Sequence, residues 1–149
     1  MSFDASAFGP QINHQQIVEE LSHLKGWENK YRQVIKWGKL LPVMSDTNKE
    51  QLVEVAGCES QVWLYCEPVK VGKLSFWQVH ADSDARIVRG LIAIVQAAFN
   101  GQTSETILGF DVAEYFEKLG LIEHLSPSRG NGLRAIVDQI IEQVEQHQN

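Results

Sequence analysis

The clearest pattern along the chain is an apolar stripe of helical period near its C-terminal end. Six apolar residues recur at the spacing of one helix face for more than three turns: Leu133, Ile136, Val137, Ile140, Ile141 and Val144. Glu142, Glu145 and Gln146 fall on the opposite side. The pattern predicts an amphipathic helix that packs on the core through this stripe.

Near the N-terminal end, capping residues predict where a first helix begins. Asn13 and Gln16 have the spacing of a capping box, and Ile12 and Ile17 have that of a hydrophobic staple. One apolar face follows, formed by Ile17, Leu21 and Leu24. Gly26 is expected to end this helix, because glycine favours helix termini.

A second helix is predicted over residues 27–40, antiparallel to the first. One of its sides is apolar and carries Trp27, Tyr31, Val34 and Ile35. Pro42 ends it, because proline cannot continue a helix. Ser45 or Asp46 then caps a short third helix that is expected to reach about Val53.

The middle of the chain predicts a β-hairpin. Residues 62–67 and 73–80 are rich in Val, Trp, Tyr and Phe, the residue types that strands prefer. Residues 68–72 between them include proline and glycine, so we expect the turn there. The predicted sheet is therefore small and antiparallel.

Residues 87–99 form the most apolar segment of the chain. Arg89 interrupts it, and it is shorter than the roughly 20 residues that cross a bilayer, so we predict a buried core helix. Asp82 or Ser83 is expected to cap it, with residues 100–101, Asn-Gly, at its end.

Two further helix starts are visible. Asp111 and Glu114 predict a capping box for a helix that ends at Gly120. Residues 126–132, Ser-Pro-Ser-Arg-Gly-Asn-Gly, are expected to lead into the last helix, with glycines that loosen the chain before it. The predicted fold is thus α+β, a small antiparallel sheet packed against several helices.

Length and composition limit the organisation and the function. The 149 residues are enough for one domain, 1–149, with ends at 1–11 and 146–149 that we expect to fray. A net charge of −6 without a basic run argues against nucleic-acid binding. The first ten residues have no charged and apolar pattern of a secretory signal, and we find no membrane span, so a cytoplasmic location is expected.

Cys58 is the most informative residue for chemistry. It follows Gly57 in a predicted loop with polar neighbours, whereas free cysteines are usually buried in the core. The alternative is that Cys58 is buried under the loop as a small apolar side chain. A thiol needs a lowered pKa to react at neutral pH, and the adjacent Glu59 has the opposite effect. Four cations could lower the pKa of the Cys58 thiol: Lys49, Arg86, Arg89 and Arg129.

Other chemistries are weaker. Cys66 lies within a predicted strand, where core packing is the simpler interpretation, and a zinc site lacks a second pair of ligands. A cysteine hydrolase with His80 or His124 as the base is conceivable on composition alone. The glycines after Arg129 do not form a phosphate-binding loop.

Three motifs together closely resemble the SufE/CsdE family of sulfur-acceptor proteins. Residues 57–63 read Gly-Cys-Glu-Ser-Gln-Val-Trp. Residues 82–91 read Asp-Ser-Asp-Ala-Arg-Ile-Val-Arg-Gly-Leu, and residues 125–129 read Leu-Ser-Pro-Ser-Arg with Gly-Leu at 132–133. Trp27-Glu28 with Tyr31, and Leu41-Pro42, also fit the family, so the resemblance covers most of the chain.

The resemblance implies a SufE-like fold, similar to the IscU type, and a role in sulfur transfer. In the family, a loop cysteine accepts sulfur as a persulfide from a cysteine desulfurase of the SufS or CsdA kind and passes it on, mainly toward iron–sulfur cluster assembly. Cys58 matches this cysteine. Gly57 matches a hinge of the loop, and Asp84 and Arg129 match supporting positions. No cofactor is implied for this chain, because pyridoxal phosphate belongs to the desulfurase.

Several questions stay open at this level. Cys66 is outside the family motif and could be inert or form a disulfide with Cys58 under oxidation. Residues 110–112 and 125–129 look more like the SufE branch than the CsdE branch. The oligomeric state could be a monomer or a homodimer. The alternative function is that of a non-catalytic adaptor that binds a desulfurase. A desulfurase activator with a covalent persulfide intermediate is expected rather than an independent enzyme.

Overall fold

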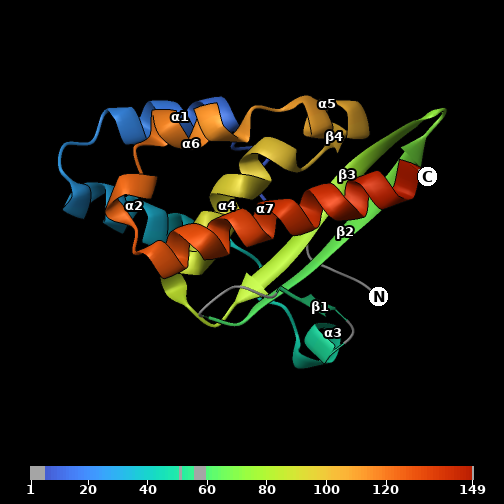
Figure 1. The fold of residues 1–149 in the computed structure, drawn as a ribbon, viewed down its shortest axis with the longest axis horizontal. Coiled ribbons are helices and arrows are strands. Elements are labelled where there is room, and N and C mark those ends of the chain that lie inside the picture. Colours follow the sequence, from blue (N-terminus) through green and yellow to red (C-terminus); the bar gives the residue numbers. More distant parts are fainter. Residues whose placement is uncertain (1–5, 51, 56–59, 149) are drawn as a thin grey trace.

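A computed structural model describes residues 6–50, 52–55 and 60–148 (Figure 1). Its centre is a long antiparallel hairpin of β2 (Val62–Val71) and β3 (Leu74–Ser83). Helices cover this hairpin, with α4 (Arg86–Phe99) and α7 (Pro127–Gln148) lying along it. The predicted α+β fold class is confirmed. The loop that carries Gly57 and Cys58 lies outside the described residues.

The hairpin is longer than its predicted strands, and its turn is tighter. The predicted turn over residues 68–72 is wrong, since Pro68 pairs with Trp77 within the ladder. Proline fits there because the Trp77 carbonyl faces away from it and accepts from the Gly101 N–H at 2.7 Å. The turn is the Gly72-Lys73 pair, in which Gly72 has a φ of 64° that other residues avoid.

Two short strands that the sequence did not predict extend the sheet to the order β1-β2-β3-β4. β1 (Val53–Glu54) pairs with β2, and β4 (Gln102–Thr103) pairs with β3. The short third helix was predicted through Val53, but α3 (Asp46–Glu50) ends earlier, because Val53 joins the sheet. Ser45 accepts from the Asn48 N–H at 3.2 Å, as a capping residue does.

Side-chain amides bond to the sheet where strands are absent. On the β3 edge, the Asn100 Oδ1 atom accepts from the Val79 N–H at 2.6 Å, and the Gln96 Nε2 atom donates to the Val79 carbonyl at 2.9 Å. On the β2 edge, the Gln143 Oε1 atom accepts from the Cys66 N–H at 2.9 Å. Helices α4 and α7 thus satisfy backbone groups that a neighbouring strand would otherwise bond.

Helix α4 is the buried centre of the fold. Twelve of its fourteen residues are buried, which confirms the predicted core helix. Its predicted N-terminal cap is wrong, because Asp82 and Ser83 are the last residues of β3 and Ala85 stands at the N-cap, whereas the predicted end at Asn100 is confirmed. Gly90 allows α2 (Trp27–Leu40) to cross closely, since a Cβ there would lie 2.2 Å from the Val34 carbonyl oxygen.

The predicted capping box of α1 (His14–Ser22) is confirmed at Asn13 and Gln16. The bounds of α2 also agree with the sequence pattern. The two helices do not pack mainly on each other as an antiparallel pair: α2 packs on α4, and α1 packs on α4 and α6. Phe8 is fully buried, so packed structure begins within the N-terminal residues expected to fray.

After β4, the described chain consists of helices and one 3-10 turn. In order they are α5 (Ser104–Gly109), which was not predicted, α6 (Val112–Leu119), η1 (Ile122–His124) and α7. Asp111 caps α6 by accepting from the Glu114 N–H at 3.0 Å, and Gly120 ends it in the left-handed conformation. The predicted loose lead into the last helix is wrong, because α7 starts at Pro127 and includes both Gly130 and Gly132.

The predicted core stripe of α7 can be tested at Ile140, which is fully buried. Replacing Ile140 with alanine removes buried methyl groups and leaves a cavity, so we expect Ile140→Ala to lower the free energy of unfolding by about 2–5 kcal/mol. Urea unfolding followed by tryptophan fluorescence measures this. The exposed control Glu145→Ala should change it by less than about 0.5 kcal/mol. Equal stability of the two variants would contradict the core assignment.

Candidate functional site

Hydrogen bonds hold both stems of the segment that carries Cys58. On one side, the Val55 N–H donates to the Val62 carbonyl at 2.9 Å. On the other, the Gln61 N–H donates to the Asp84 Oδ1 atom at 3.0 Å. The Gln61 carbonyl accepts from the Ser83 hydroxyl at 2.7 Å and from the Asp84 N–H at 3.3 Å. The chain therefore enters and leaves this segment at fixed points.

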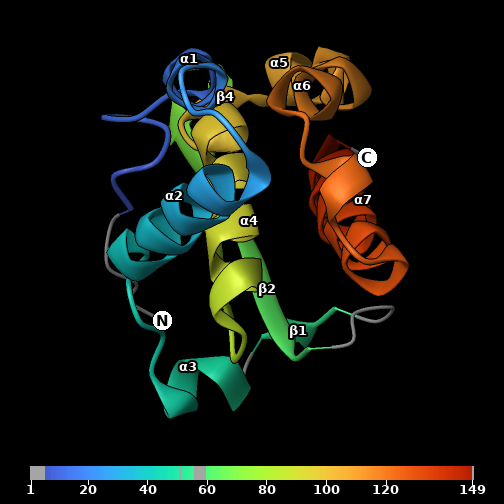
Figure 2. The same cartoon turned by 90° about the vertical axis from the view of Figure 1, so that its left-hand side faces the viewer.

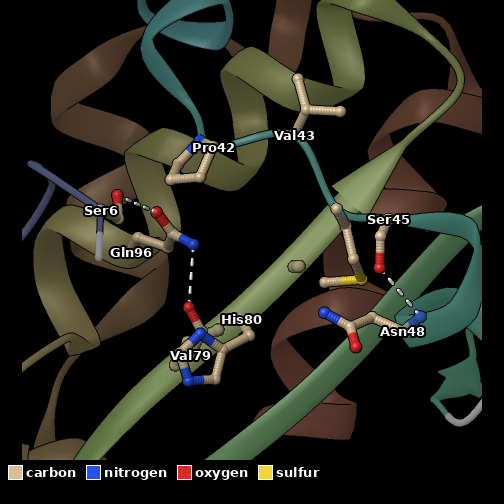
Figure 3. A pocket seen from close by; sticks show the side chains of 10 residues that line it. Ser6, Pro42, Val43, Ser45, Asn48, Val79, His80 and Gln96 are labelled. Carbon is tan, nitrogen blue, oxygen red and sulfur yellow. Dashed lines mark hydrogen bonds between the residues drawn. The ribbon is translucent and has the colours of Figure 1, made fainter. Parts of the chain in front are cut away.

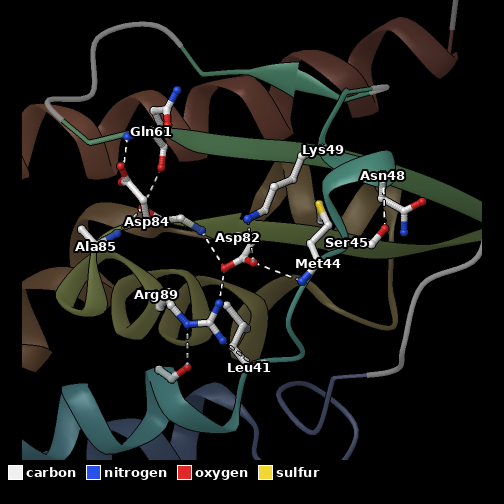
Figure 4. A network of polar contacts seen from close by, with 12 residues as sticks. Leu41, Met44, Ser45, Asn48, Lys49, Gln61, Asp82, Asp84, Ala85 and Arg89 are labelled. Atoms are coloured by element: carbon white, nitrogen blue, oxygen red, sulfur yellow. Dashed lines mark hydrogen bonds and ion pairs between the residues drawn. The ribbon is translucent and has the colours of Figure 1, made fainter.

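Asp84 is one of the supporting residues expected from the family resemblance, and the structure places it at the stem of the predicted loop (Figure 4). Its backbone N–H and its carboxylate both bond to Gln61, so the two residues form a local pair across 23 positions of sequence. Ser83 strengthens the same stem through its hydroxyl. The bond of Ser83 to the stem was not predicted from the sequence, because a serine shortly before a helix is also typical of a helix cap.

A small, mainly apolar cavity of about 10 Å³ lies beside the second stem, between α4 and α7. The described residues that line it are Ser60, Val88, Leu91, Ser128, Arg129, Gly132, Leu133 and Ile136. Ser60, at the end of the Cys58 segment, and Arg129 both line this cavity. The resemblance singled out Arg129, and the structure joins it to the segment through Ser60.

The first turn of α7 adds positive potential at the cavity. Ser126 caps the helix, since its hydroxyl accepts from the Arg129 N–H at 3.3 Å, and Pro127 occupies the first helical position. Unpaired N–H groups at a helix start favour nearby negative charge. A helix start of this kind is one of the surroundings that stabilise a thiolate.

The other three predicted cations have different positions. Arg89 is engaged by the buried Asp82 carboxylate and by the carbonyls of Gly38 and Leu41. Lys49 lies 4.4 Å from the centre of the Trp63 ring and 3.9 Å from Asp82. Arg86 is exposed at the start of α4. Arg129 is therefore the cation of this group that lines the cavity beside Ser60.

Asp82 is the centre of a buried polar network just before the loop stem (Figure 4). Its carboxylate is paired with Arg89 and accepts from the backbone N–H groups of Ser83 at 2.8 Å and Met44 at 3.1 Å. With only 2% of its side chain exposed, Asp82 depends on these partners for its charge. The network joins the end of β3 to α4 and to the chain between α2 and α3.

Cys66 is a core residue, as its strand position predicted. It is free and 4% exposed, and burial raises the pKa of its thiol to about 12. A thiol with such a pKa is protonated near neutral pH and reacts slowly. Whether it could pair with Cys58 depends on a residue outside the described part of the chain.

The two histidines proposed as bases lie in different places. His80 lines a cavity of about 210 Å³ with residues of the connection after α2 (Figure 3). Its Nε2 atom is 3.2 Å from the Glu67 carboxylate, and burial lowers the pKa of His80 despite that neighbour. His124 stacks on Trp27 with 4.7 Å between ring centres. These contacts account for both rings as structural residues, without a role as the base of a hydrolase.

The described residues contain no group of three or more His, Cys, Asp or Glu side chains arranged to hold a metal ion. Among the helices over residues 6–50 and 60–148, none combines the length and apolar character of a bilayer span.

The two neighbouring aspartates should differ sharply in their effect on stability. Asp82→Ala leaves the Arg89 charge without its carboxylate, so the free energy of unfolding should fall by about 3–5 kcal/mol. Asp84 is exposed, and Asp84→Ala should cost less than about 1 kcal/mol while it removes the acceptor of the Gln61 N–H. Urea unfolding and amide hydrogen exchange at Gln61 measure the two effects. An Asp84→Ala protein that keeps full protection of the Gln61 amide would refute the stem assignment.

The reactivity of Cys66 is predictable from its burial. With its thiol pKa raised to about 12, the thiolate population near pH 8 should be roughly a thousandfold below that of an ordinary cysteine. In a Cys58→Ser background, iodoacetamide should therefore modify Cys66 at least about a hundredfold more slowly in the native protein than in urea. Mass spectrometry against time measures both rates, and equal rates would show that the thiol is accessible.

Comparison with known proteins agrees with this geometry. The SufE family model, described as an Fe-S metabolism associated domain, matches residues 15–144. An uncharacterised SufE-like protein of Rhizobium meliloti is 42% identical over 130 residues, which are 87% of this chain and 93% of the relative. The sulfur acceptor protein CsdE of Escherichia coli is 38% identical over 144 residues, 97% of this chain and 96% of the relative.

A solved structure shows the same fold. The solution structure of a hypothetical protein from Thermus thermophilus superposes with a TM-score of 0.71 and covers 93% of this chain and 96% of its own. Its sequence identity is 18%, so it supports the fold alone.

Proposed function

Since the chain belongs to the SufE family, we propose that it is a sulfur acceptor, which takes sulfur from a pyridoxal-phosphate cysteine desulfurase as a persulfide on Cys58. Its 38% identity with the sulfur acceptor CsdE over nearly the whole of both chains supports this role. The protein also stimulates the desulfurase and passes sulfur onward, in the first place to iron–sulfur cluster assembly.

The observation that carries the proposal is the held stem beside a small apolar cavity that Arg129 helps to line. Consecutive Cα atoms are about 3.8 Å apart, so chain connectivity keeps the Cα atom of Cys58 within about 7.6 Å of that of Ser60. Ser60 lines the cavity together with Arg129, and Gln61 is bonded to Ser83 and Asp84. The stem that leads to Cys58 is therefore held beside this cavity.

The transfer itself is a thiol exchange in which atoms and charges balance. The Cys58 thiolate attacks the outer sulfur of the persulfide on the desulfurase cysteine, and the bond between the two desulfurase sulfurs breaks as the bond to the Cys58 sulfur forms. The desulfurase cysteine leaves as a thiolate, and the outer sulfur keeps its proton. No external oxidant or reductant takes part in this step.

Arg129 and the first turn of α7 favour this exchange by stabilising the attacking thiolate. Opposite charge and helix-start N–H groups lower a thiol pKa, which raises the thiolate fraction at neutral pH. The side chains of Val88, Leu91 and Leu133 make the lining of the cavity beside Ser60 apolar. Asp84 is a positioning residue, because it acts on the stem rather than on the sulfur.

The proposal is tested by intact-protein mass spectrometry after incubation with a cysteine desulfurase and L-cysteine. Wild type and Cys66→Ser should each gain the mass of one sulfur atom, which a reductant removes, and Cys58→Ser should gain none. A decrease in helical content of Cys58→Ser by circular dichroism would mean that loss of fold, and not loss of the thiol, explains the result.

Other outcomes identify the alternatives. If Cys58→Ser supports full sulfur delivery and full stimulation of the desulfurase, the protein is a non-catalytic adaptor. If the protein alone hydrolyses esters or amides in a Cys58-dependent way, it is a thiol hydrolase. If an active desulfurase adds no sulfur to any of the three proteins, the acceptor proposal is wrong for that desulfurase.

A further inference from the structure

An apolar groove of about 760 Å³ runs between α6 and α7, on the opposite side of α7 from the cavity beside Ser60. Phe116 and Val137 are buried at its base, and Phe110, Ile122 and Ile141 are half-buried along it. A surface groove with this many apolar side chains is unusual for a part of a protein that contacts only water.

The walls of the groove are held rigidly by contacts behind them. Phe110 packs edge-on against Phe99 at 5.7 Å and against Tyr115 at 5.5 Å, and the Tyr115 hydroxyl donates to the Ile94 carbonyl at 2.8 Å. At the other end, the stacked His124 ring fixes η1 on α2. A preformed groove loses little conformational entropy when a partner binds, which favours binding.

Charge around the groove indicates the chemistry of its occupant. Glu117, Glu123 and Asp138 line it, against Arg134 on the same rim and the Lys30 ammonium near Gly120. Within the described chain, Glu117 and Asp138 form no ion pair, so their carboxylates are available to a partner. An apolar base with exposed carboxylates on both helices suits an amphipathic helix that has lysine or arginine beside its apolar face.

The groove and the cavity of the candidate site lie on the two sides of one helix, α7. Arg129 lines the cavity and Arg134 lines the groove, so the two sites are about 7.5 Å apart along the helix axis and are separated by the width of α7. Figure 2 shows α6, α7 and β1 along one side of the molecule, with α7 between the other two. An interface of ordinary size, roughly 800 Å² for each partner, reaches across α7 from the Cys58 stem to the groove.

We propose that the α6–α7 groove is a second contact for the cysteine desulfurase, in which a basic amphipathic helix of that enzyme docks while its persulfide meets Cys58. This inference rests on the proposed function, because it takes the desulfurase as the partner. The groove supplies affinity and orientation, and the Cys58 segment supplies the chemistry. Glu117 and Asp138 are therefore binding residues that take no part in the sulfur exchange.

The test is charge reversal on the groove with a charge-matched control, in a Cys58→Ser background that separates binding from transfer. Glu117→Lys/Asp138→Lys should weaken desulfurase binding about tenfold, measured by titration calorimetry, and should reduce its salt dependence. Glu20→Lys/Glu105→Lys changes the net charge equally at exposed positions on α1 and α5 and should bind like the Cys58→Ser parent. Ala113→Arg, exposed on α6 and lining the groove, should also weaken binding. Thermal unfolding confirms that all variants fold.

The outcomes separate this inference from the proposed function. If both charge variants and Ala113→Arg bind as tightly as the parent, or the parent itself does not bind, the groove is not a desulfurase contact. Sulfur transfer to wild-type Cys58 would leave the proposed function in place in that case. If only the groove variants lose affinity but wild-type Cys58 never gains sulfur, the groove inference stands and the acceptor function fails. Equal weakening in groove and control variants indicates a general charge effect and overturns the inference.

Discussion

The site depends on one interaction, the ion pair between the buried Asp82 carboxylate and Arg89. A charge this deep in the protein is stable only when it is paired, and Arg89 together with two backbone N–H groups provides the pairing. Arg89 also bonds to the carbonyls at the end of α2, so one carboxylate holds a strand, two helices and a connection in one arrangement. The residues that follow Asp82 in sequence, Ser83 and Asp84, then lie where they bond to Gln61. The stem of the Cys58 segment is thus positioned by the same turn of chain that completes the ion pair.

Much of the fold follows from local pattern. The helices at residues 27–40 and 86–99 and the hairpin were predictable, because each has a long apolar period or a run of strand-forming side chains. The two-residue strands β1 and β4 were not, since so short a strand has no period of its own and forms only where a partner strand passes. The start of α7 was missed for a different reason. Gly130 and Gly132 disfavour a helix by themselves, but burial of Gly132 and Leu133 against the core outweighs that preference.

The candidate site was predictable to a lesser extent. Cys58 could be singled out as a loop thiol, but its role came from the likeness of three motifs to a known family. Asp84 and Arg129 are 45 residues apart in sequence, and the structure brings both to the stem of one segment. The partner of Asp82 could not be inferred, because aspartate before a helix is equally typical of a cap and of a buried ion pair. The structure decides between the cap and the ion pair, because β3 extends two residues past Ala81 and so makes Asp82 a strand residue.

The amide side chains that bond to the sheet edges have a consequence for self-association. An open strand edge is a template on which another extended chain can add, and the hairpin is long enough to serve as one. Gln96 and Asn100 bond to the backbone of Val79, and Gln143 bonds to the backbone N–H of Cys66. Amides carry no charge, so they can be buried there without a counterion, and they offer both a donor and an acceptor as a strand would. At Val79 and Cys66 these amides thereby take the place that a further strand would occupy beside the hairpin.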